Sequence, residues 1–372
     1  MSRILIYSLM ILTTFILIQC GKDDPIIEIP EEEMEMEKDT TTGEENIERF
    51  YRTDNYIVDD IAVEVYIPSD YDSTQQYPVI YLNDGDLMAE VYAQMINFEA
   101  DPFIMVGLSD DRKRAERFLP YFDQWVEDNV GEYTPKADEY SRSIVEEVIP
   151  FVESEYSILA RKRAIFGISF GGIHATWIAI RYPQVFSFVG AISPSYWVAG
   201  KSIYNEPLFK LNPGGFNIPT TFYIDRGTAE WENYLTFIEL LKEEGLVYGQ
   251  TIYYYEVIGA DHEMTDWTFR IEVPFRLFME GTTTATEVKM DVSSYCVEIW
   301  DEPGVKYGRI NPLLTFNNGV KYSATSEATY TITQGTGQVI NDGSYFINQG
   351  TSLTVDVKYQ DFETTIELNK CN

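Results

Sequence analysis

The hydrophobic and polar positions between residues 48 and 283 alternate between strand-like and helix-like patterns. In residues 61–67 branched apolar side chains recur at every second position, and a proline follows. Residues 77–82 and 103–108 are continuous apolar runs, which are typical of strands covered on both faces. Residues 144–156 instead carry apolar side chains at helical spacing. Further strands are predicted at 163–166, 185–192, 220–224 and 252–258. Strands alternating with helices predict an α/β fold with a mostly parallel central sheet covered by helices on both faces.

The pattern changes at about residue 285, where helical spacing stops. Alternating segments separated by Gly and Asn turns predict strands at 319–324, 328–333 and 352–359. We therefore divide this part of the chain into an α/β domain, 48–283, and a small all-β, sandwich-like antiparallel domain, 284–372. The second domain is interpreted as a passive accessory module, and sugar binding by its exposed aromatic residues is the alternative.

The N-terminal segment combines a targeting pattern with an acidic tether. An apolar stretch at 4–18 is shorter than the roughly 20 residues that span a bilayer, and Cys20 follows it. Residues 1–20 resemble a bacterial lipoprotein signal with Cys20 as the lipidated residue, and an ordinary secretory signal with a chance cysteine is the alternative. Residues 21–47 carry runs of like charge and no aromatic residue, so we expect a disordered spacer rather than an acidic interaction tail. The expected location is the bacterial outer membrane, either surface-exposed or facing the periplasm.

The charge composition limits the kinds of partner that the protein can bind. The chain has 60 Asp and Glu against 27 Lys and Arg, a net charge of −33. Such a chain repels nucleic acid and anionic membrane surfaces. We therefore expect no nucleic-acid partner, and membrane contact only through the lipid anchor. The 45% hydrophobic content is enough to bury a substantial core.

One motif carries candidate chemistry. Residues 167–172, Gly-Ile-Ser-Phe-Gly-Gly, form a G-x-S-x-G sequence that follows an apolar strand and precedes a helical segment, 173–181. The glycines allow a sharp turn from strand to helix, which leaves the hydroxyl of Ser169 exposed above the sheet. The N-terminus of the helix favours developing negative charge. This context predicts that Ser169 is a catalytic nucleophile.

A nucleophilic serine needs a base, and the chain has two histidines. His174 falls in the helix directly after the serine, so we interpret it as structural. His262 follows the last predicted strand, and the chain order of serine, acid and histidine selects it as the base. The acid must then lie between them, after the strand at 220–224. Glu230 is favoured because it lies farther along the loop and reaches the imidazole, whereas Asp225 is expected to stabilise the end of the strand.

Other polar residues around these positions receive smaller roles. Asp261 and Glu263 flank the histidine and are expected to order its loop. An oxyanion hole needs two backbone N–H groups, predicted at Phe170 and at Asp86, with Leu87 as the second choice for the latter. The sequence has no metal-ligand cluster, and with one histidine assigned to catalysis we expect neither a metal nor a cofactor.

The motifs together carry a resemblance to a known family. They are 77–85, the serine motif at 167–172, the Ser-Pro-Ser-Tyr-Trp segment at 193–197, 227–230, and Asp261-His262 with Trp267. The chain resembles the α/β-hydrolase family that groups esterase D, enterochelin esterases, feruloyl and acetylxylan esterases, and mycolyltransferases, over most of 55–280. The resemblance implies an α/β-hydrolase fold, with Trp197 lining the acyl pocket and Arg114 lining the cleft. Core packing is the alternative role for Trp197. Two departures, Ala260 before Asp261-His262 and Asn83 at a commonly apolar position, bear on specificity.

The cysteines suggest one crosslink. After Cys20, the chain retains Cys296 and Cys371, near opposite ends of the predicted β-rich domain. An exported protein meets an oxidising compartment, so we expect these two residues to form a disulfide.

The sequence therefore predicts a serine esterase that hydrolyses carboxylic esters through an acyl-enzyme on Ser169. The expected substrate is a small-molecule or glycan-linked ester, including siderophore esters and esters on plant polysaccharide. An acyltransferase of the same fold and a non-catalytic surface binding lipoprotein are the alternatives.

Overall fold

The structure is a computed structural model that describes residues 51–98, 100–109, 112–206, 220–230, 233–298 and 306–371. The predicted signal with Cys20 and the predicted tether, residues 21–47, lie outside the described residues. The described residues belong to one compact unit.

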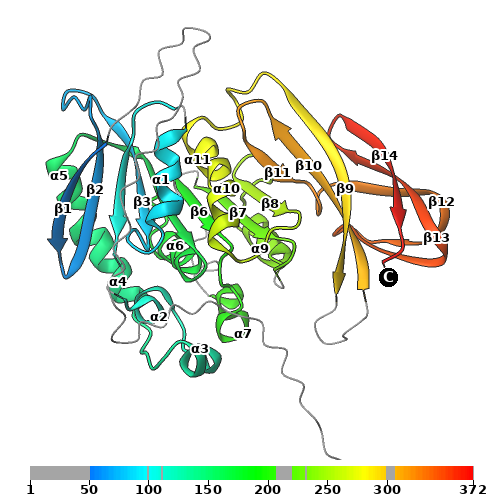
Figure 1. Ribbon diagram of the computed structural model, residues 1–372, viewed down its shortest axis with the longest axis horizontal. Helices are drawn as coiled ribbons and strands as arrows, with labels where there is room; N and C mark the ends of the chain where they lie inside the picture. Colours follow the sequence, from blue (N-terminus) through cyan, green and yellow to red (C-terminus); the bar gives the residue numbers. More distant parts are fainter. Residues whose placement is uncertain are drawn as a thin grey trace, which may run out of the picture. The chain divides into compact units, whose positions relative to one another are not determined.

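An eight-stranded sheet forms the centre of the first part of the fold (Figure 1). Its strands are β1 (Tyr51–Val58), β2 (Ile61–Pro68), β3 (Tyr77–Asn83), β4 (Ile104–Leu108), β5 (Ile158–Ile168), β6 (Phe188–Ile192), β7 (Thr221–Gly227) and β8 (Ile252–Val257). They follow the order β1-β2-β4-β3-β5-β6-β7-β8. The pairs β1–β2 and β2–β4 are antiparallel, and every later pair is parallel. The predicted α/β fold with a mostly parallel sheet is confirmed.

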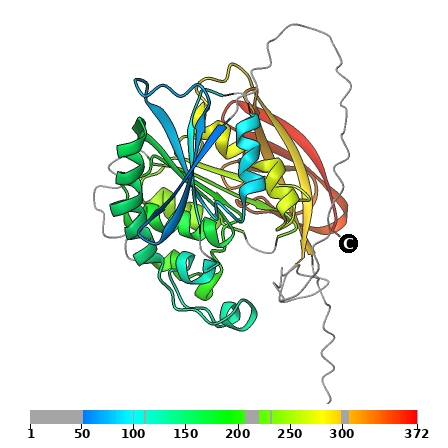
Figure 2. The same ribbon diagram turned by 60° about the vertical axis from the view of Figure 1, so that its left-hand side comes forward.

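Helices cover both faces of this sheet. α1 (Ala89–Asn97), α10 (Met264–Arg270) and α11 (Glu272–Met279) contact one another, while α6 (Phe170–Arg181) contacts α4 (Ala137–Ser143) and α2 (Arg114–Phe118). Figure 2 shows the cyan and yellow helices α1 and α11 on one side of the sheet and the green helices α4 and α5 (Ile149–Glu155) on the other. Val79, Ile104 and Val189 on the central strands are fully buried, as expected for a sheet covered on both faces.

Shorter elements complete this part. The helix predicted at 144–156 is a π-helical turn, η1 (Ile144–Val148), followed by α5. Within the described residues, the remaining elements are α3 (Gln124–Asn129), α7 (Val198–Lys201), η2 (Ser202–Asn205) and α9 (Leu235–Glu243). None of the helices in the described ranges has both the length and the apolar character to cross a membrane.

The residues after α11 form a six-stranded antiparallel sheet. Its strands are β9 (Val288–Glu298), β10 (Lys306–Phe316), β11 (Lys321–Ser323), β12 (Thr329–Val339), β13 (Ser344–Tyr359) and β14 (Phe362–Asn369). The predicted all-β character is confirmed. The strands form one curled sheet, because the long β13 pairs with β10 near its start and with β14 near its end. A disulfide joins Cys296 on β9 to Cys371 beyond β14.

Candidate active site

Three loops at the carboxyl edge of the parallel sheet bring the predicted catalytic side chains together. Ser169 follows β5, Glu230 follows β7, and His262 follows β8. In open α/β sheets, ligands bind outside the carboxyl ends of the strands. The fold therefore places these side chains where a substrate site is expected.

Ser169 occupies a strained turn between β5 and α6. Its backbone has φ 59° and ψ −118°, an uncommon conformation for a residue other than glycine. The flanking glycines are required by space. A Cβ atom on Gly167 would lie 1.9 Å from the carbonyl oxygen of Gly171, and a Cβ atom on Gly172 would lie 2.9 Å from Cα of Pro194. The motif thus builds the sharp elbow that its sequence predicts.

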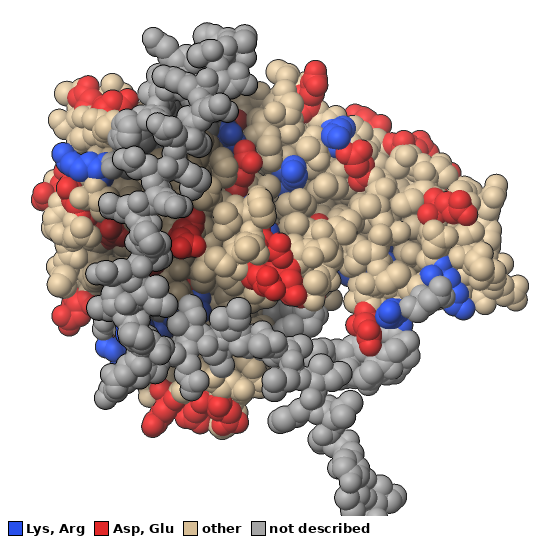
Figure 3. Space-filling model, in the orientation of Figure 1, with Lys and Arg blue, Asp and Glu red and all other residues tan. Residues whose placement is uncertain are grey.

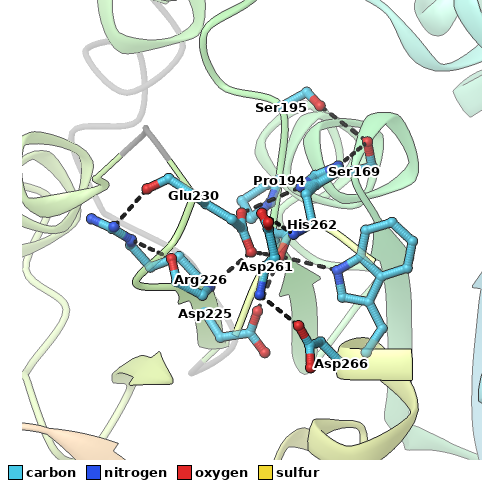
Figure 4. A network of polar contacts seen from close by, with 12 residues as sticks. Ser169, Pro194, Ser195, Asp225, Arg226, Glu230, Asp261, His262 and Asp266 are labelled. Atoms are coloured by element: carbon cyan, nitrogen blue, oxygen red, sulfur yellow. Dashed lines mark hydrogen bonds and ion pairs between the residues drawn. The ribbon is translucent and has the colours of Figure 1, made fainter. Parts of the chain in front are cut away.

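The imidazole of His262 bridges the serine and the acid (Figure 4). Its Nε2 lies 3.0 Å from Ser169 Oγ, and its Nδ1 lies 3.3 Å from Glu230 Oε2. The ring of Trp267 packs edge-on against it, with the ring centroids 4.9 Å apart. Ser195 Oγ is a second hydroxyl 3.3 Å from Ser169 Oγ. The His262 side chain is 38% exposed, so the serine–histidine pair is open to solvent.

The carboxylate of Glu230 is buried and saturated with donors on one oxygen. Oε1 accepts hydrogen bonds from the Gly227 N–H at 2.7 Å, the Ser193 hydroxyl at 2.7 Å and Arg270 Nη2 at 3.1 Å. Burial alone would raise the pKa of Glu230, but the hydrogen bond from His262 and the charge of Arg270 outweigh it and lower the pKa to about 2. The acid is therefore ionised at neutral pH, with Oε2 facing the imidazole.

Asp225, the competing candidate for the acid, lies deeper at the end of β7. It is fully buried, accepts hydrogen bonds from the Ser193 N–H at 3.0 Å and the Tyr223 hydroxyl at 2.9 Å, and pairs with Arg270 at 3.5 Å. Burial raises its pKa to about 6, against the lowering influence of Arg270. Its position matches the predicted stabilisation of the strand end, and Glu230 is the carboxylate on the imidazole.

His174 lies in α6 beneath the elbow, with no exposed surface. Its Nδ1 is 3.1 Å from Asn83 Oδ1, and its Nε2 is 3.1 Å from Ser141 Oγ. Burial lowers the pKa of His174 to about 3, so the ring is neutral at ordinary pH. A fully buried Ser141–His174 pair has no access to substrate. The Asn83 side chain also donates to the carbonyl of Gly171 at 2.9 Å, which gives this residue a structural role below the serine turn.

Arg114, predicted to line the cleft, is bound to the loop after β3 and to the end of β5. Its guanidinium binds both oxygens of the buried Asp84, at 2.6 and 2.8 Å, and donates to the carbonyl of Ile168 at 3.3 Å. It also lies 5.4 Å from the ring centroid of Phe170. Arg114 thus joins the loop after β3 to the backbone immediately before Ser169, and its side chain is 23% exposed.

The loop after β3 carries the predicted second half of the oxyanion hole. Asp86 and Leu87 are exposed, and the Asp86 carboxylate accepts a hydrogen bond from Ser109 at 2.8 Å. Phe170 begins α6, and the first N–H groups of a helix have no partner within it. The Asn83 and Arg114 contacts described above bring this loop beside the serine turn.

Aromatic side chains extend from the elbow onto the surface. Trp197 is partly buried and lies 6.3 Å from the ring of Phe170 and 5.3 Å from the ring of Trp125 on α3. Trp125 is 50% exposed and Phe122 is 47% exposed. Phe122 stacks on Tyr133. These five residues form what we call the aromatic rim.

The sequence reasoning missed the residues that hold the acid. Arg270 is buried on α10 and bonds to the Ser193 hydroxyl as well as to Glu230, and Trp267 Nε1 donates to the same hydroxyl at 3.2 Å. No local pattern in the sequence marks Arg270 as a partner of Glu230. Asp261 accepts from the His262 N–H at 2.8 Å, which agrees with its predicted loop role. Within the described residues, no group of His, Cys, Asp and Glu could hold a metal ion.

The sequence matches the family model described as "Putative esterase" over residues 55–273. This match spans more than half of the chain and includes all three side chains of the relay. The chain belongs to this esterase family.

Individual relatives are distant. The chain is 22% identical over 160 residues to the uncharacterized protein YbbA of Bacillus subtilis, covering 40% of this chain and 62% of that protein. It is 27% identical over 186 residues to an endo-1,4-beta-xylanase/feruloyl esterase of Xylanibacter ruminicola, covering 42% of this chain and 24% of that protein. The chain therefore spans less than two thirds of the length of these relatives. The solved structure of the siderophore hydrolase EstA from Aspergillus nidulans aligns with a TM-score of 0.49 and 17% identity, covering 65% of this chain and 99% of that chain.

Proposed function

We propose that this protein is a serine carboxylic-ester hydrolase whose catalytic residues are Ser169, His262 and Glu230. The observation that carries the proposal is the continuous relay from Ser169 Oγ to His262 at 3.0 Å and from His262 to Glu230 at 3.3 Å. Nucleophile, base and orienting acid within hydrogen-bond reach are the geometric signature of nucleophilic catalysis. Membership of the esterase family supports the same reaction class.

The reaction proceeds in two acyl transfers. His262 Nε2 takes the hydroxyl proton of Ser169 while Oγ attacks the ester carbonyl, and the resulting tetrahedral intermediate expels the alcohol, which receives that proton. The acyl-enzyme remains on Ser169. Water, deprotonated by the same imidazole, then attacks the acyl carbon, and the acid is released as the proton returns to Ser169. Glu230 accepts a hydrogen bond from Nδ1 and stabilises the imidazolium in both halves.

The oxyanion of each intermediate is assigned to backbone N–H groups. Phe170 supplies one, as the first residue of α6, where the helix dipole adds favourable charge. Asp86 supplies the other, with Leu87 as the alternative on the same loop. The Arg114 contacts to Asp84 and Ile168 support this role, because they hold the loop and the serine turn in one arrangement.

The aromatic rim supports a substrate with an aromatic or sugar group beside the ester. Exposed aromatic rings bind planar or apolar faces of ligands, and Trp197 links Phe170, next to the nucleophile, to Trp125. One relative is named as a feruloyl esterase, an enzyme for aromatic acyl esters. The net charge of −33 disfavours anionic substrates. On the face shown in Figure 3, acidic side chains are spread among the described residues, with basic ones between them. We therefore infer a neutral aromatic acyl ester, on a polysaccharide or a siderophore, as the substrate class.

The test is labelling by a fluorophosphonate probe together with an ester screen. The wild-type protein should be labelled at Ser169, and Ser169→Ala should not be. The protein should hydrolyse the feruloyl and catecholate esters, which carry aromatic acyl groups, faster than the acetyl ester. Added alcohol acceptors would reveal an acyltransferase if product ester forms faster than free acid. A folded wild-type protein that neither labels nor hydrolyses any activated ester would refute the proposal and favour a binding lipoprotein.

We also propose that Cys20 anchors the protein to the bacterial outer membrane. The short apolar stretch before Cys20 supports this, and the disulfide between Cys296 and Cys371 suits an exported protein. Metabolic labelling with palmitate should mark the wild type and fail on Cys20→Ala. Equal labelling of the two proteins would refute the anchor.

A further inference from the structure

A buried carboxylate in the last strand of the α/β sheet is surrounded by side chains of the C-terminal sheet. Glu256 on β8 has 1% of its surface exposed. Arg309 on β10 pairs with Oε1 at 3.1 Å. Tyr295 on β9 and Thr325 donate hydrogen bonds to Oε2 at 3.1 and 3.3 Å. One neighbour from its own strand, Tyr254, donates to Oε1 at 3.2 Å. The C-terminal sheet therefore supplies most of what satisfies this charge.

The backbone of Glu256 is held from the same side. Its N–H donates to the Ser323 hydroxyl at 3.0 Å, and its carbonyl accepts from Asn311 Nδ2 at 3.0 Å. β8 ends at Val257, five residues before His262. The contacts of the C-terminal sheet thus fix the strand that leads into the histidine loop.

A second buried arginine lies next to Glu256 on the neighbouring strand. Arg226 on β7 is the register partner of Glu256 on β8, and it is 3% exposed. Its guanidinium binds backbone carbonyls of the loop that carries Glu230, and the charge of Glu256 also acts on it. It donates to the carbonyls of Gly227 at 3.0 Å, Thr228 at 3.2 Å and Glu230 at 2.7 Å (Figure 4). Arg226 is therefore the side chain that closes the loop carrying the catalytic acid.

These contacts set up a competition for Arg226. A buried carboxylate without a cation is costly, and Glu256 has two arginines near it. Because Arg309 satisfies Glu256, the guanidinium of Arg226 remains available for the Glu230 carbonyl. Without Arg309, the arginine that still acts on Glu256 would be its register partner Arg226, and forming that pair would withdraw the donors from the acid loop.

We propose that Arg309 of the C-terminal sheet is a positioning residue for the esterase site. It neutralises Glu256, which leaves Arg226 to hold Glu230 toward His262. The C-terminal sheet is then part of the catalytic unit and not an independent accessory module. The catalytic consequence rests on the proposed function, whereas the effect on the acid loop does not.

The experiment compares Arg309→Met, Glu256→Gln and the double variant in the full chain. Arg309→Met should lower kcat by about tenfold with little change in KM, the size expected when coupled neighbours lose one member. The double variant should recover most of this loss, because a neutral glutamine side chain on β8 no longer attracts Arg226. Hydrogen exchange of the 227–230 amides should be faster in Arg309→Met and return toward wild type in the double variant.

A matched control separates positioning from stability. Leu353 is buried in the same sheet, against Gly335 and Gly337, and takes no part in the Glu256 contacts given above. Leu353→Ala should lower Tm but leave kcat and the exchange of 227–230 unchanged at temperatures well below Tm. If Arg309→Met does not fold, Arg309→Lys, which keeps the charge, provides the comparison and should show a smaller loss of kcat.

The outcomes decide each claim independently. If Arg309→Met and Leu353→Ala change kcat and loop exchange alike at equal Tm, or if the double variant shows no recovery, the positioning role is overturned. If the wild type has no esterase activity, the proposed function fails, and the exchange of 227–230 alone decides whether Arg309 orders the acid loop.

Discussion

Replacing Glu230 by glutamine tests the role of the acid with the smallest change of shape. The carbonyl oxygen of the new side chain can retain the place of Oε1, where three donors from Gly227, Ser193 and Arg270 converge. The amide nitrogen must then face His262 Nδ1. An N–H donor there favours the tautomer with the proton on Nε2, and that imidazole cannot accept the proton of Ser169.

The expected loss follows from the geometry. A carboxylate 3.3 Å from the imidazolium that forms during attack contributes about 5 kcal/mol at an effective dielectric constant of about 20. Each 1.36 kcal/mol corresponds to about tenfold in rate, so the upper bound is between about 10³ and 10⁴ in kcat. Arg270 already neutralises part of the Glu230 charge, which lowers this bound. We expect Glu230→Gln to reduce kcat by about 10²–10³.

The assay is kcat on a soluble chromogenic ester, with circular dichroism and Tm to confirm folding. Asp225→Asn is the matched control, because it removes a neighbouring buried carboxylate that also pairs with Arg270. We expect this control to stay within about tenfold of wild-type kcat. An inactive, folded Asp225→Asn together with an active Glu230→Gln would show that the acid has been assigned to the wrong residue.

Three further predictions concern stability. The folded pKa of Asp225, about 6, lies above its unfolded value of 3.8, so the folded state binds the proton more tightly than the unfolded state. The free energy of unfolding should therefore fall as pH rises from about 4 to 6, by up to about 1.4 kcal/mol per pH unit. Asp225→Asn should flatten the corresponding slope of Tm against pH. The disulfide between Cys296 and Cys371 closes a loop of 75 residues, so reducing it should lower the free energy of unfolding by about 2–4 kcal/mol in a denaturant titration. Two free thiols in the unreduced mature protein would show that the disulfide does not form. Gly167→Ala should abolish or severely destabilise folding, because its Cβ would lie 1.9 Å from a carbonyl oxygen in the first turn of α6; Gly107→Ala, whose nearest contact is 3.4 Å, should fold, and a Gly167→Ala protein with wild-type Tm would contradict the reasoning.

The central sheet could be predicted because its strands are short, apolar and regularly spaced. Residues 77–82 and 252–258 match β3 and β8 within one residue at their ends. β1 was missed, since only one of its faces packs on the fold and polar residues interrupt its pattern. In the C-terminal sheet, β9, β10 and β14 were missed. Nearly every second residue on β9 and β14 is exposed, so their apolar signal is weak. β10 is largely buried, but Gly, Arg, Asn and Pro interrupt its apolar pattern.

The site shows where sequence reasoning reaches its limit. Ser169 and His262 could be identified from local motifs and chain order, and the choice of Glu230 followed from reach along a loop. The partners of that acid could not be found in this way. Arg270 lies on α10, outside the loop that carries Glu230, and the Asn83–His174 pair spans 91 residues of sequence. Such contacts depend on how distant elements meet across the sheet, and a single sequence contains no local pattern for them.

The unequal use of the two Glu230 oxygens has a dynamic consequence. A carboxylate on a flexible side chain ordinarily rotates about its last bond and exchanges its oxygens freely. Here three donors form hydrogen bonds to Oε1, and all three bonds would have to break before the carboxylate could rotate. The imidazole therefore meets the same lone pairs at the same place in every turnover, and no solvent or side chain has to reorient when its positive charge appears. The reorganisation cost of the proton transfer is met during folding instead of during each catalytic cycle.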